Sequence, residues 1–126
     1  MNFKDRKMVS KKDIAEAIIQ KVEEENNDVM IMTSMIEGYE RPEVIMSKEK
    51  QAAGYSPDVM LRNDDIIELY EIDLDLDFKL DKWMLFSNFT SSDKRTFSIV
   101  TPEDNVTPLK AFLKENDIEA RILFFS

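Results

Sequence analysis

Apolar residues near the start of the chain recur at the spacing of an amphipathic helix. The apolar positions are Ile14, Ala15, Ile18, Ile19 and Val22. Ser10 and Asp13 stand just before this stripe at the spacing of a capping box, in which each side chain bonds the backbone of the other residue. We therefore predict a helix over roughly 11–25.

The next part of the chain is apolar over 29–36 and then loses any clear pattern. The run 29–36 is rich in Met and ends before Gly38, and its length favours a buried strand. Residues 40–57 mix charged residues with Pro and Gly. Within them, 44–46 is interpreted as a short extension of the first strand or as part of a hairpin.

The clearest pattern in the chain is a strict alternation of apolar and acidic residues. Two apolar segments, 58–62 and 66–78, flank the turn-forming sequence 63–65, which predicts a pair of antiparallel strands. In the second segment the apolar residues are Ile72, Leu74, Leu76 and Phe78, and the acidic residues are Glu71, Asp73, Asp75 and Asp77. Because strand side chains alternate between faces, one acidic face is expected. For Asp75 and Asp77 we expect a solvated sheet edge that needs no metal.

The last part of the chain predicts a helix, a strand, a second helix and a final strand. These elements cover 79–89, 95–101, a helix capped by Thr107 with Pro108 as its first residue, and 119–126. The predicted order is α-β-β-β-α-β-α-β. We expect one α/β domain over 1–126, with a mixed sheet flanked by helices.

The composition removes several classes of enzyme. The chain of 126 residues has no Cys and no His, which excludes a thiolate nucleophile, a Ser-His triad and any Cys or imidazole metal site. Its two Gly residues cannot form the Gly-rich phosphate-binding loops of Rossmann or P-loop proteins. Any metal site must therefore be built from oxygen ligands.

The formal net charge of −9 is unevenly distributed. Residues 1–12 carry five Lys or Arg and one Asp, and we expect 1–10 to form a flexible basic arm. Acidic residues concentrate in 13–28 and 63–82. This charge disfavours a nucleic-acid partner. Since no apolar stretch suits a signal peptide or a membrane span, we expect a cytoplasmic protein without membrane contact.

Pairing the two strands around the turn brings carboxylates together. A tight turn within 62–65 places Asp58 opposite Leu69. Glu71 then lies diagonal to Asp58 on the same face, so both side chains are within reach of one ion. The sequence therefore predicts a divalent metal shared by Asp58 and Glu71. A slip of one residue would place the two carboxylates on opposite faces.

The residues around this pair resemble the signature of a known family. Pro57-Asp58 and, after twelve intervening residues, Glu71-Ile72-Asp73 resemble the P-D…(D/E)-x-K motif of the restriction-endonuclease-like superfamily. The predicted α-β-β-β-α-β order over 11–101 is similar to the core of that superfamily. The resemblance implies a metal-dependent nuclease that hydrolyses phosphodiesters. The sequence departs at the third position, where Asp73 stands in place of the lysine.

The resemblance also implies roles for individual residues. The implied ligands of Mg²⁺ or Mn²⁺ are Asp58, Glu71, Asp73 and Glu16, and the implied catalytic residues are Asp58, Glu71, Asp73, Lys82 and Lys79. Asp73 is either a third ligand or an inactivating replacement. Lys79 or Lys82, at the start of the next helix, is a candidate for the place of the missing lysine. Glu16 matches a carboxylate that family members take from the first helix, although the helical wheel turns it away from the sheet.

Two other hypotheses stand beside the nuclease. The missing lysine and the net charge of −9 favour a catalytically inactive nuclease-like domain that serves as a protein-interaction or assembly module. Its partner is then a second copy of the chain or another protein. The third hypothesis is a metal-binding domain with oxygen ligands and no turnover. Cleavage that requires Mg²⁺ or Mn²⁺ and Asp58 separates the nuclease from both.

Overall fold

The described helices and strands follow the predicted order α-β-β-β-α-β-α-β, with one added 3₁₀ turn. The computed structural model describes residues 9–25, 28–47 and 54–126, so the predicted basic arm 1–10 lies almost entirely outside the described residues. The helices are α2 (Lys11–Glu24), α3 (Leu80–Phe89) and α4 (Val106–Glu115), and the 3₁₀ turn is η1 (Glu103–Asn105). The strands are β1 (Met30–Thr33), β2 (Val59–Arg62), β3 (Ile67–Ile72), β4 (Arg95–Pro102) and β5 (Arg121–Phe125).

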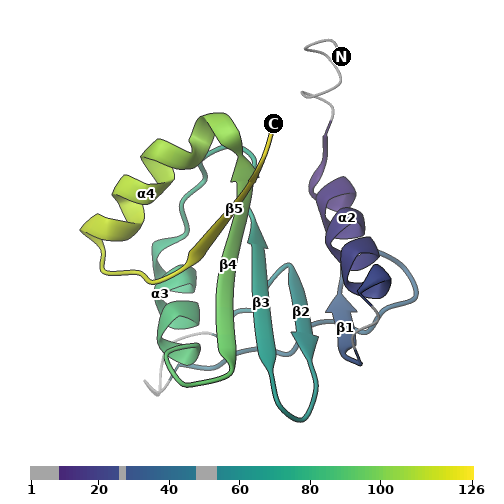
Figure 1. Ribbon diagram of the computed structural model, residues 1–126. Coiled ribbons are helices and arrows are strands. Elements are labelled where there is room, and N and C mark those ends of the chain that lie inside the picture. Colours follow the sequence, from purple (N-terminus) through teal and green to yellow (C-terminus); the bar gives the residue numbers. More distant parts are fainter. Residues whose placement is uncertain (1–8, 26–27, 48–53) are drawn as a thin grey trace.

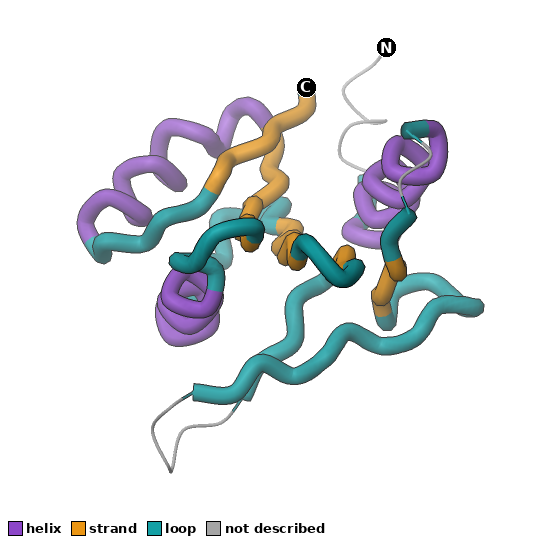
Figure 2. Tube along the Cα trace, turned by 60° about the horizontal axis from the view of Figure 1, so that its bottom comes forward, coloured by secondary structure: helices purple, strands orange, loops and turns teal. Residues whose placement is uncertain are grey.

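The strands form one mixed sheet in the order β1-β2-β3-β4-β5. β1, β2 and β3 pair antiparallel, whereas β4 is parallel to β3 and β5 is parallel to β4. Each parallel connection needs a crossover, and the helices α3 and α4 supply them. Figure 1 shows α2 on one side of the sheet and α3 and α4 on the other, and Figure 2 shows the same separation from a second direction. The described residues therefore form a single α/β domain with three α-helices around a five-stranded sheet.

Alternation along the central strands divides the core into two clusters. Leu69, Phe97 and Ile99 pack against the buried residues of α3 and α4. Tyr70, Ile72 and Val100 face the opposite side, where the apolar stripe of α2 covers them. Neighbouring residues of β3 and β4 therefore point to different layers, as the pleat of a strand requires.

The N-terminal helix begins as the sequence predicts. Ser10 Oγ accepts a hydrogen bond from Asp13 N at 3.1 Å, and Asp13 Oδ2 accepts one from Ser10 N at 2.9 Å. Both halves of the capping box are therefore formed. This fixes the position of Lys11, the first residue of α2, whose side chain reaches the site described below.

The segment after this helix is less regular than predicted. β1 covers only Met30–Thr33 instead of 29–36, because the chain turns away after Thr33, whose N donates to Glu40 O at 2.8 Å. Gly38 allows the turn with φ +97°. The segment 44–46 does not extend β1. Ile45 instead makes an isolated antiparallel bridge to Tyr55, in which each backbone N donates to the other residue's O, and this is the kind of pairing that the hairpin alternative predicts.

The predicted strand 66–78 is wrong beyond Ile72, where β3 ends. Asp73 Oδ1 accepts hydrogen bonds from Asp75 N at 3.3 Å and Asp77 N at 3.0 Å, and these bonds curl the chain out of the sheet. Leu76 has a left-handed backbone with φ 59°, which no strand tolerates. The predicted continuous acidic face is therefore absent, since Glu71 and Asp73 are buried while Asp75 and Asp77 are exposed in a loop.

Helix α4 begins two residues earlier than its sequence signal suggests. Its first residue is Val106 and its N-cap is Asn105, so Thr107 is not the cap and Pro108 is not the first helical residue. Pro108 still lies within the first turn, where a backbone N–H has no partner inside the helix. None of the helices in the described ranges combines the length and the apolar character needed to cross a membrane.

Candidate functional site

The β2–β3 turn sets which residues of the two strands lie opposite each other. Asn63 Oδ1 accepts hydrogen bonds from Asp65 N at 2.7 Å and Ile66 N at 2.9 Å, and Asn63 N donates to Ile66 O at 3.1 Å. The turn therefore closes between Asn63 and Ile66, one residue later than the predicted turn within 62–65. This moves the register of the whole hairpin by two residues.

The shifted register brings Asp58 and Glu71 closer than predicted. Val59 lies opposite Tyr70, and one further step along the antiparallel register places Asp58 beside Glu71. The predicted pairing of Asp58 with Leu69 is therefore wrong. A shift of two residues leaves every side chain on its face, so the predicted convergence of the two carboxylates survives.

Each of the two carboxylates accepts a hydrogen bond from a backbone N–H group of the neighbouring strand segment. Asp58 N donates to Glu71 Oε2 at 3.1 Å, and Ile72 N donates to Asp58 Oδ2 at 2.8 Å. Glu71 is 2% exposed and the Asp58 side chain is 12% exposed. The carboxylates are thus fixed at the start of β2 and the end of β3, and Asp58 is the one nearer to solvent.

Lysines from two helices flank the carboxylates. Lys82 Nζ, in the first turn of α3, lies 3.0 Å from Glu71 Oε2 and 5.7 Å from the centre of the Phe86 ring. Lys11 Nζ, in the first turn of α2, lies 3.6 Å from Asp58 Oδ2. Of the two lysines suggested by the sequence, Lys82 is the one in contact with Glu71. Its side chain is only 15% exposed, so solvent screens this ion pair weakly.

Lys79 takes a different position, at the edge of the site. Its Nζ lies 2.7 Å from Asp77 Oδ2. The hydrogen bond to Asp77 raises the pKa of Lys79, and the charges of Glu71 and Asp73 act in the same direction. Lys79 is therefore a cation close to both buried carboxylates without an ion pair to either.

Trp83 completes the environment of Glu71. Its Nε1 donates to Glu71 Oε1 at 3.0 Å, and the indole is 1% exposed. The ring also packs against Phe78 and Phe112, with centroid distances of 6.1 and 6.0 Å. Both oxygens of Glu71 are therefore held by donors from the chain itself.

Burial is the main electrostatic influence on Glu71. It raises the pKa of this carboxyl above the ordinary 4.5, and the nearby charge of Asp58 raises it further. Lys82 and the Trp83 hydrogen bond lower the pKa of Glu71, but they do not cancel the effect of burial. The folded protein thus binds a proton at Glu71 more tightly than the unfolded chain does.

This raised pKa predicts a pH-dependent stability that Glu71→Gln removes. The proton bound at Glu71 adds to the free energy of unfolding. This stabilisation is complete below pH 4.5 and is lost as the pH rises through the higher pKa of Glu71 in the folded state. The free energy of unfolding of the natural protein, minus that of Glu71→Gln, should therefore grow as the pH falls from neutral toward 4.5. Urea titrations across this range measure it. A difference that stays flat or shrinks on acidification would contradict the assignment.

Asp73 lies beside the pair, and the chain itself already uses one of its two carboxylate oxygens. The side chain is 4% exposed, and Oδ1 is engaged by the two backbone N–H groups of the following loop. Its Oδ2 is buried and has no hydrogen-bond partner. A cavity of about 50 Å³ lies against Glu71, Asp73, Lys11, Lys79 and Trp83.

Asp58 and Glu71 are the two carboxylates of this site that could act as ligands of a divalent cation. Within 9–25, 28–47 and 54–126, no group of three or more Asp or Glu residues is arranged to hold a metal. Mg²⁺ commonly keeps several waters and takes only one or two carboxylates from a protein, so a site of this kind would need no third carboxylate. Lys82 already occupies one side of Glu71 Oε2, which leaves Asp58 as the more accessible ligand.

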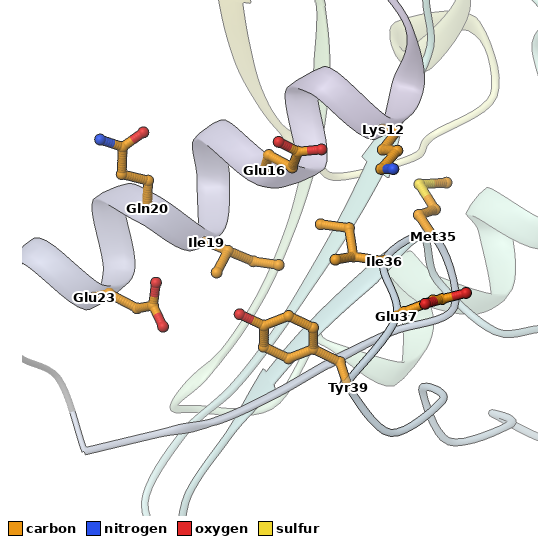
Figure 3. Close-up of a pocket in the computed structure, with 9 residues that line it drawn as sticks. All are labelled: Lys12, Glu16, Ile19, Gln20, Glu23, Met35, Ile36, Glu37 and Tyr39. Atoms are coloured by element: carbon orange, nitrogen blue, oxygen red, sulfur yellow. The ribbon is translucent and has the colours of Figure 1, made fainter.

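Glu16 is not brought to this site. It lines a separate, open groove of about 850 Å³ between α2 and the segment after β1. Figure 3 shows Glu16 on α2, with Ile36 and Tyr39 on the segment across the groove. The helical wheel predicts that Glu16 is turned away from the sheet, and Glu16 accordingly lies apart from the Asp58–Glu71 pair.

Nothing in the sequence assigns two residues, Trp83 and Lys11, to this site. Trp83 is a buried core residue of an apolar helix, and no pattern in the sequence indicates its hydrogen bond to Glu71. Lys11 is the first residue after a helix cap, and nothing in the pattern links it to Asp58, 47 positions later.

The arrangement joins two carboxylates, two ammonium groups and one indole N–H where β2 begins and β3 ends. Such a cluster can hold a cation, bind an anion such as a phosphate group, or serve as a buried ion network that stabilises the fold. Comparisons of this chain with protein-family models, with curated proteins and with solved structures found no match.

Proposed function

We propose that this protein is a metal-dependent phosphodiesterase that cleaves nucleic acid, with Asp58, Glu71 and Lys82 as its central residues. The observation that carries the proposal is the contact of Lys82 Nζ with Glu71 Oε2, at 3.0 Å, next to Asp58. The P-D…(D/E)-x-K signature requires two carboxylates and an ammonium. Here the third group comes from helix α3 instead of the motif position held by Asp73.

The mixed sheet supports the same proposal. Asp58 directly precedes β2, and Glu71 lies near the end of the antiparallel neighbour β3, which in turn pairs parallel with β4. This places the two motif halves at one end of the sheet, as the resemblance to the restriction-endonuclease-like superfamily implies. The fold-level likeness is an analogy, and the side-chain geometry is the stronger support.

In this proposal Asp58 and Glu71 hold Mg²⁺ or Mn²⁺. A bound ion of this kind polarises a phosphate oxygen and makes a coordinated water more acidic. Lys82 stabilises the negative charge that develops on the phosphate, a task that the carboxylate of Asp73 cannot perform. Trp83 and the Ile72 amide act as positioning groups, because they fix the orientation of the two carboxylates.

The local charge offers a polyanion little attraction without the metal ion. Lys11 and Lys79 border the site with side chains that are 44% and 37% exposed. These two lysines and Lys82 each lie within 4.0 Å of a carboxylate, in an acidic molecule of net charge −9. Binding of nucleic acid should therefore be weak and sensitive to salt.

The alternative is a catalytically inactive nuclease-like domain that acts as a protein-interaction module. One observation favours it: both oxygens of Glu71 are satisfied by Lys82, Trp83 and the Asp58 amide, so no ion is needed to compensate this carboxylate. In that case the cluster has only a structural role.

Cleavage assays with Mg²⁺, Mn²⁺ or a chelator separate the two proposals. Single- and double-stranded DNA and RNA are the substrates, and Asp58→Asn is the test variant. We expect cleavage only with metal, and a loss of about 100-fold or more in Asp58→Asn because a ligand charge is removed. Asp64→Asn, an exposed change in the β2–β3 turn, is the matched control and should retain full activity.

Two results would count against the nuclease. Cleavage that persists in the chelator, or that is equal in Asp58→Asn and Asp64→Asn, would show that another site or a contaminant is responsible. If the folded natural protein cleaves none of the four substrates with either metal, the interaction module becomes the better account.

A further inference from the structure

Two buried oxygen atoms near the carboxyl ends of β3 and β4 have no hydrogen-bond partner. They are Asp73 Oδ2 and Thr101 Oγ1, in residues that are 4% and 0% exposed. Buried polar atoms in folded proteins are nearly always bonded to protein, water or an ion. A pair of such orphan atoms therefore points to a group that binds there.

Strand register places these two side chains next to each other. Ile72 lies beside Val100 in the parallel pairing of β3 and β4, and Asp73 N donates to Val100 O at 2.9 Å. One further step along the register pairs Asp73 with Thr101. Ile99, two residues before Thr101, faces the α3–α4 layer, so Thr101 faces that layer as well. Adjacent strands lie roughly 4.8 Å apart, a separation that one ion or water can bridge.

The charge balance at this end of the sheet favours an ion. Three carboxylates near the site each have an ammonium group within 4.0 Å: the pairs are Asp58–Lys11, Glu71–Lys82 and Asp77–Lys79. No Lys or Arg of the described ranges makes such a pair with Asp73. The carboxyl group of Asp73 is therefore buried without an ion pair of its own in these ranges, and the nearby Lys79 is paired with Asp77 instead. Burying a charged group without a direct partner is costly. A water molecule would satisfy the hydrogen bonds but not the charge.

Space for a small group is present beside Asp73. This residue lines the cavity of about 50 Å³ described above. A single water-sized sphere needs roughly 10–15 Å³, so the cavity is large enough, on the Asp73 side of the pair, for a small ion with one or two waters. Lys79 also lines the cavity, and its positive charge disfavours a doubly charged ion at the same place.

We propose that Asp73 Oδ2 and Thr101 Oγ1 bind a monovalent metal cation, Na⁺ or K⁺, through oxygen atoms other than those of Asp58 and Glu71, although Glu71 lines the same cavity. The ion places a single positive charge directly on Asp73, which has no ion pair of its own, and water molecules complete its coordination. It braces the loop 73–77, because the other oxygen of Asp73 holds the backbone of that loop. The site does not depend on nuclease activity.

Thermal unfolding in different salts tests this site. Tm is measured in NaCl, KCl and choline chloride at equal ionic strength, for the natural protein, Asp73→Asn and Thr101→Val. We expect Tm to be about 3–6 °C higher with the metal ion that binds than with choline. This difference should disappear in both variants. It should persist in the controls Asp64→Asn and Thr107→Val, which change exposed residues.

A direct binding measurement accompanies the Tm series. The ²³Na resonance should broaden in the presence of the natural protein and sharpen again in Thr101→Val, whose near-isosteric side chain keeps the fold even if Asp73→Asn does not. Equal Tm values in all three salts without ²³Na broadening would overturn the proposal and leave a bridging water. A salt effect that is unchanged in Thr101→Val would also overturn it.

Discussion

Replacing Lys82 with Met should abolish most metal-dependent cleavage and also weaken the fold. The substitution leaves Glu71 as a buried carboxylate without its ammonium partner, which lies at 3.0 Å. Breaking a buried ion pair from one side costs about 3–5 kcal/mol. We expect about 3 kcal/mol, because Glu71 keeps its hydrogen bonds from Trp83 and from the Asp58 amide. Urea unfolding at neutral pH measures this loss of stability.

Comparing Lys82→Met with a double variant separates the effect of Lys82 on cleavage from its effect on stability. Under the proposed function, Lys82→Met should lower cleavage by about 100-fold or more under conditions where it remains folded. The double variant Glu71→Gln/Lys82→Met removes both charges and should recover part of the stability but none of the activity. Lys110→Met, an exposed change on α4, should alter neither. Full activity in folded Lys82→Met would exclude its catalytic role.

Trp83→Ala should be among the most destabilising single substitutions in the described chain, at about 3–5 kcal/mol. The indole is 1% exposed and packs against the stacked rings of Phe78 and Phe112. Its removal creates a cavity under the sheet and also deprives Glu71 Oε1 of its donor. Both effects act in the same direction, and chemical unfolding measures their sum.

Trp83→Phe isolates the hydrogen bond from the packing. It keeps most of the aromatic volume, so the expected loss is about 1–3 kcal/mol for an unsatisfied buried carboxylate oxygen. Because Glu71 then loses an orienting contact, activity should also fall. Phe112→Leu perturbs the same aromatic cluster without touching Glu71, so it should cost stability and leave specific activity intact. Equal effects of the two variants on activity would contradict a positioning role for Trp83.

The order of elements could be predicted because each segment carries its own periodicity. The capping residues Ser10 and Asp13 fixed one helix start, and the alternation around 66–72 identified the central strand. Alternation cannot show where a strand stops, however. The backbone hydrogen bonds of Asp73 and the left-handed Leu76 end β3, although the apolar–acidic pattern continues to Phe78.

The candidate site could be predicted only in part, for a related reason. The convergence of Asp58 and Glu71 depends on which face each residue occupies, and the two-residue shift produced by the Asn63 turn leaves that unchanged. The contacts of Lys82 and Lys11 depend on how two helices pack against opposite faces of the sheet. No local pattern encodes that packing, so the sequence offered Lys79 and Lys82 as equal candidates.

The most direct test of the central claim is a calorimetric titration of Mn²⁺ into the natural protein, Asp58→Ala and Glu71→Ala. It needs no assumption about the substrate, and Asp64→Ala serves as the exposed control. The account predicts saturable binding to the natural protein and to the control, with binding lost in both site variants. No binding to the natural protein, or equal binding to all four proteins, would contradict a metal site at Asp58 and Glu71.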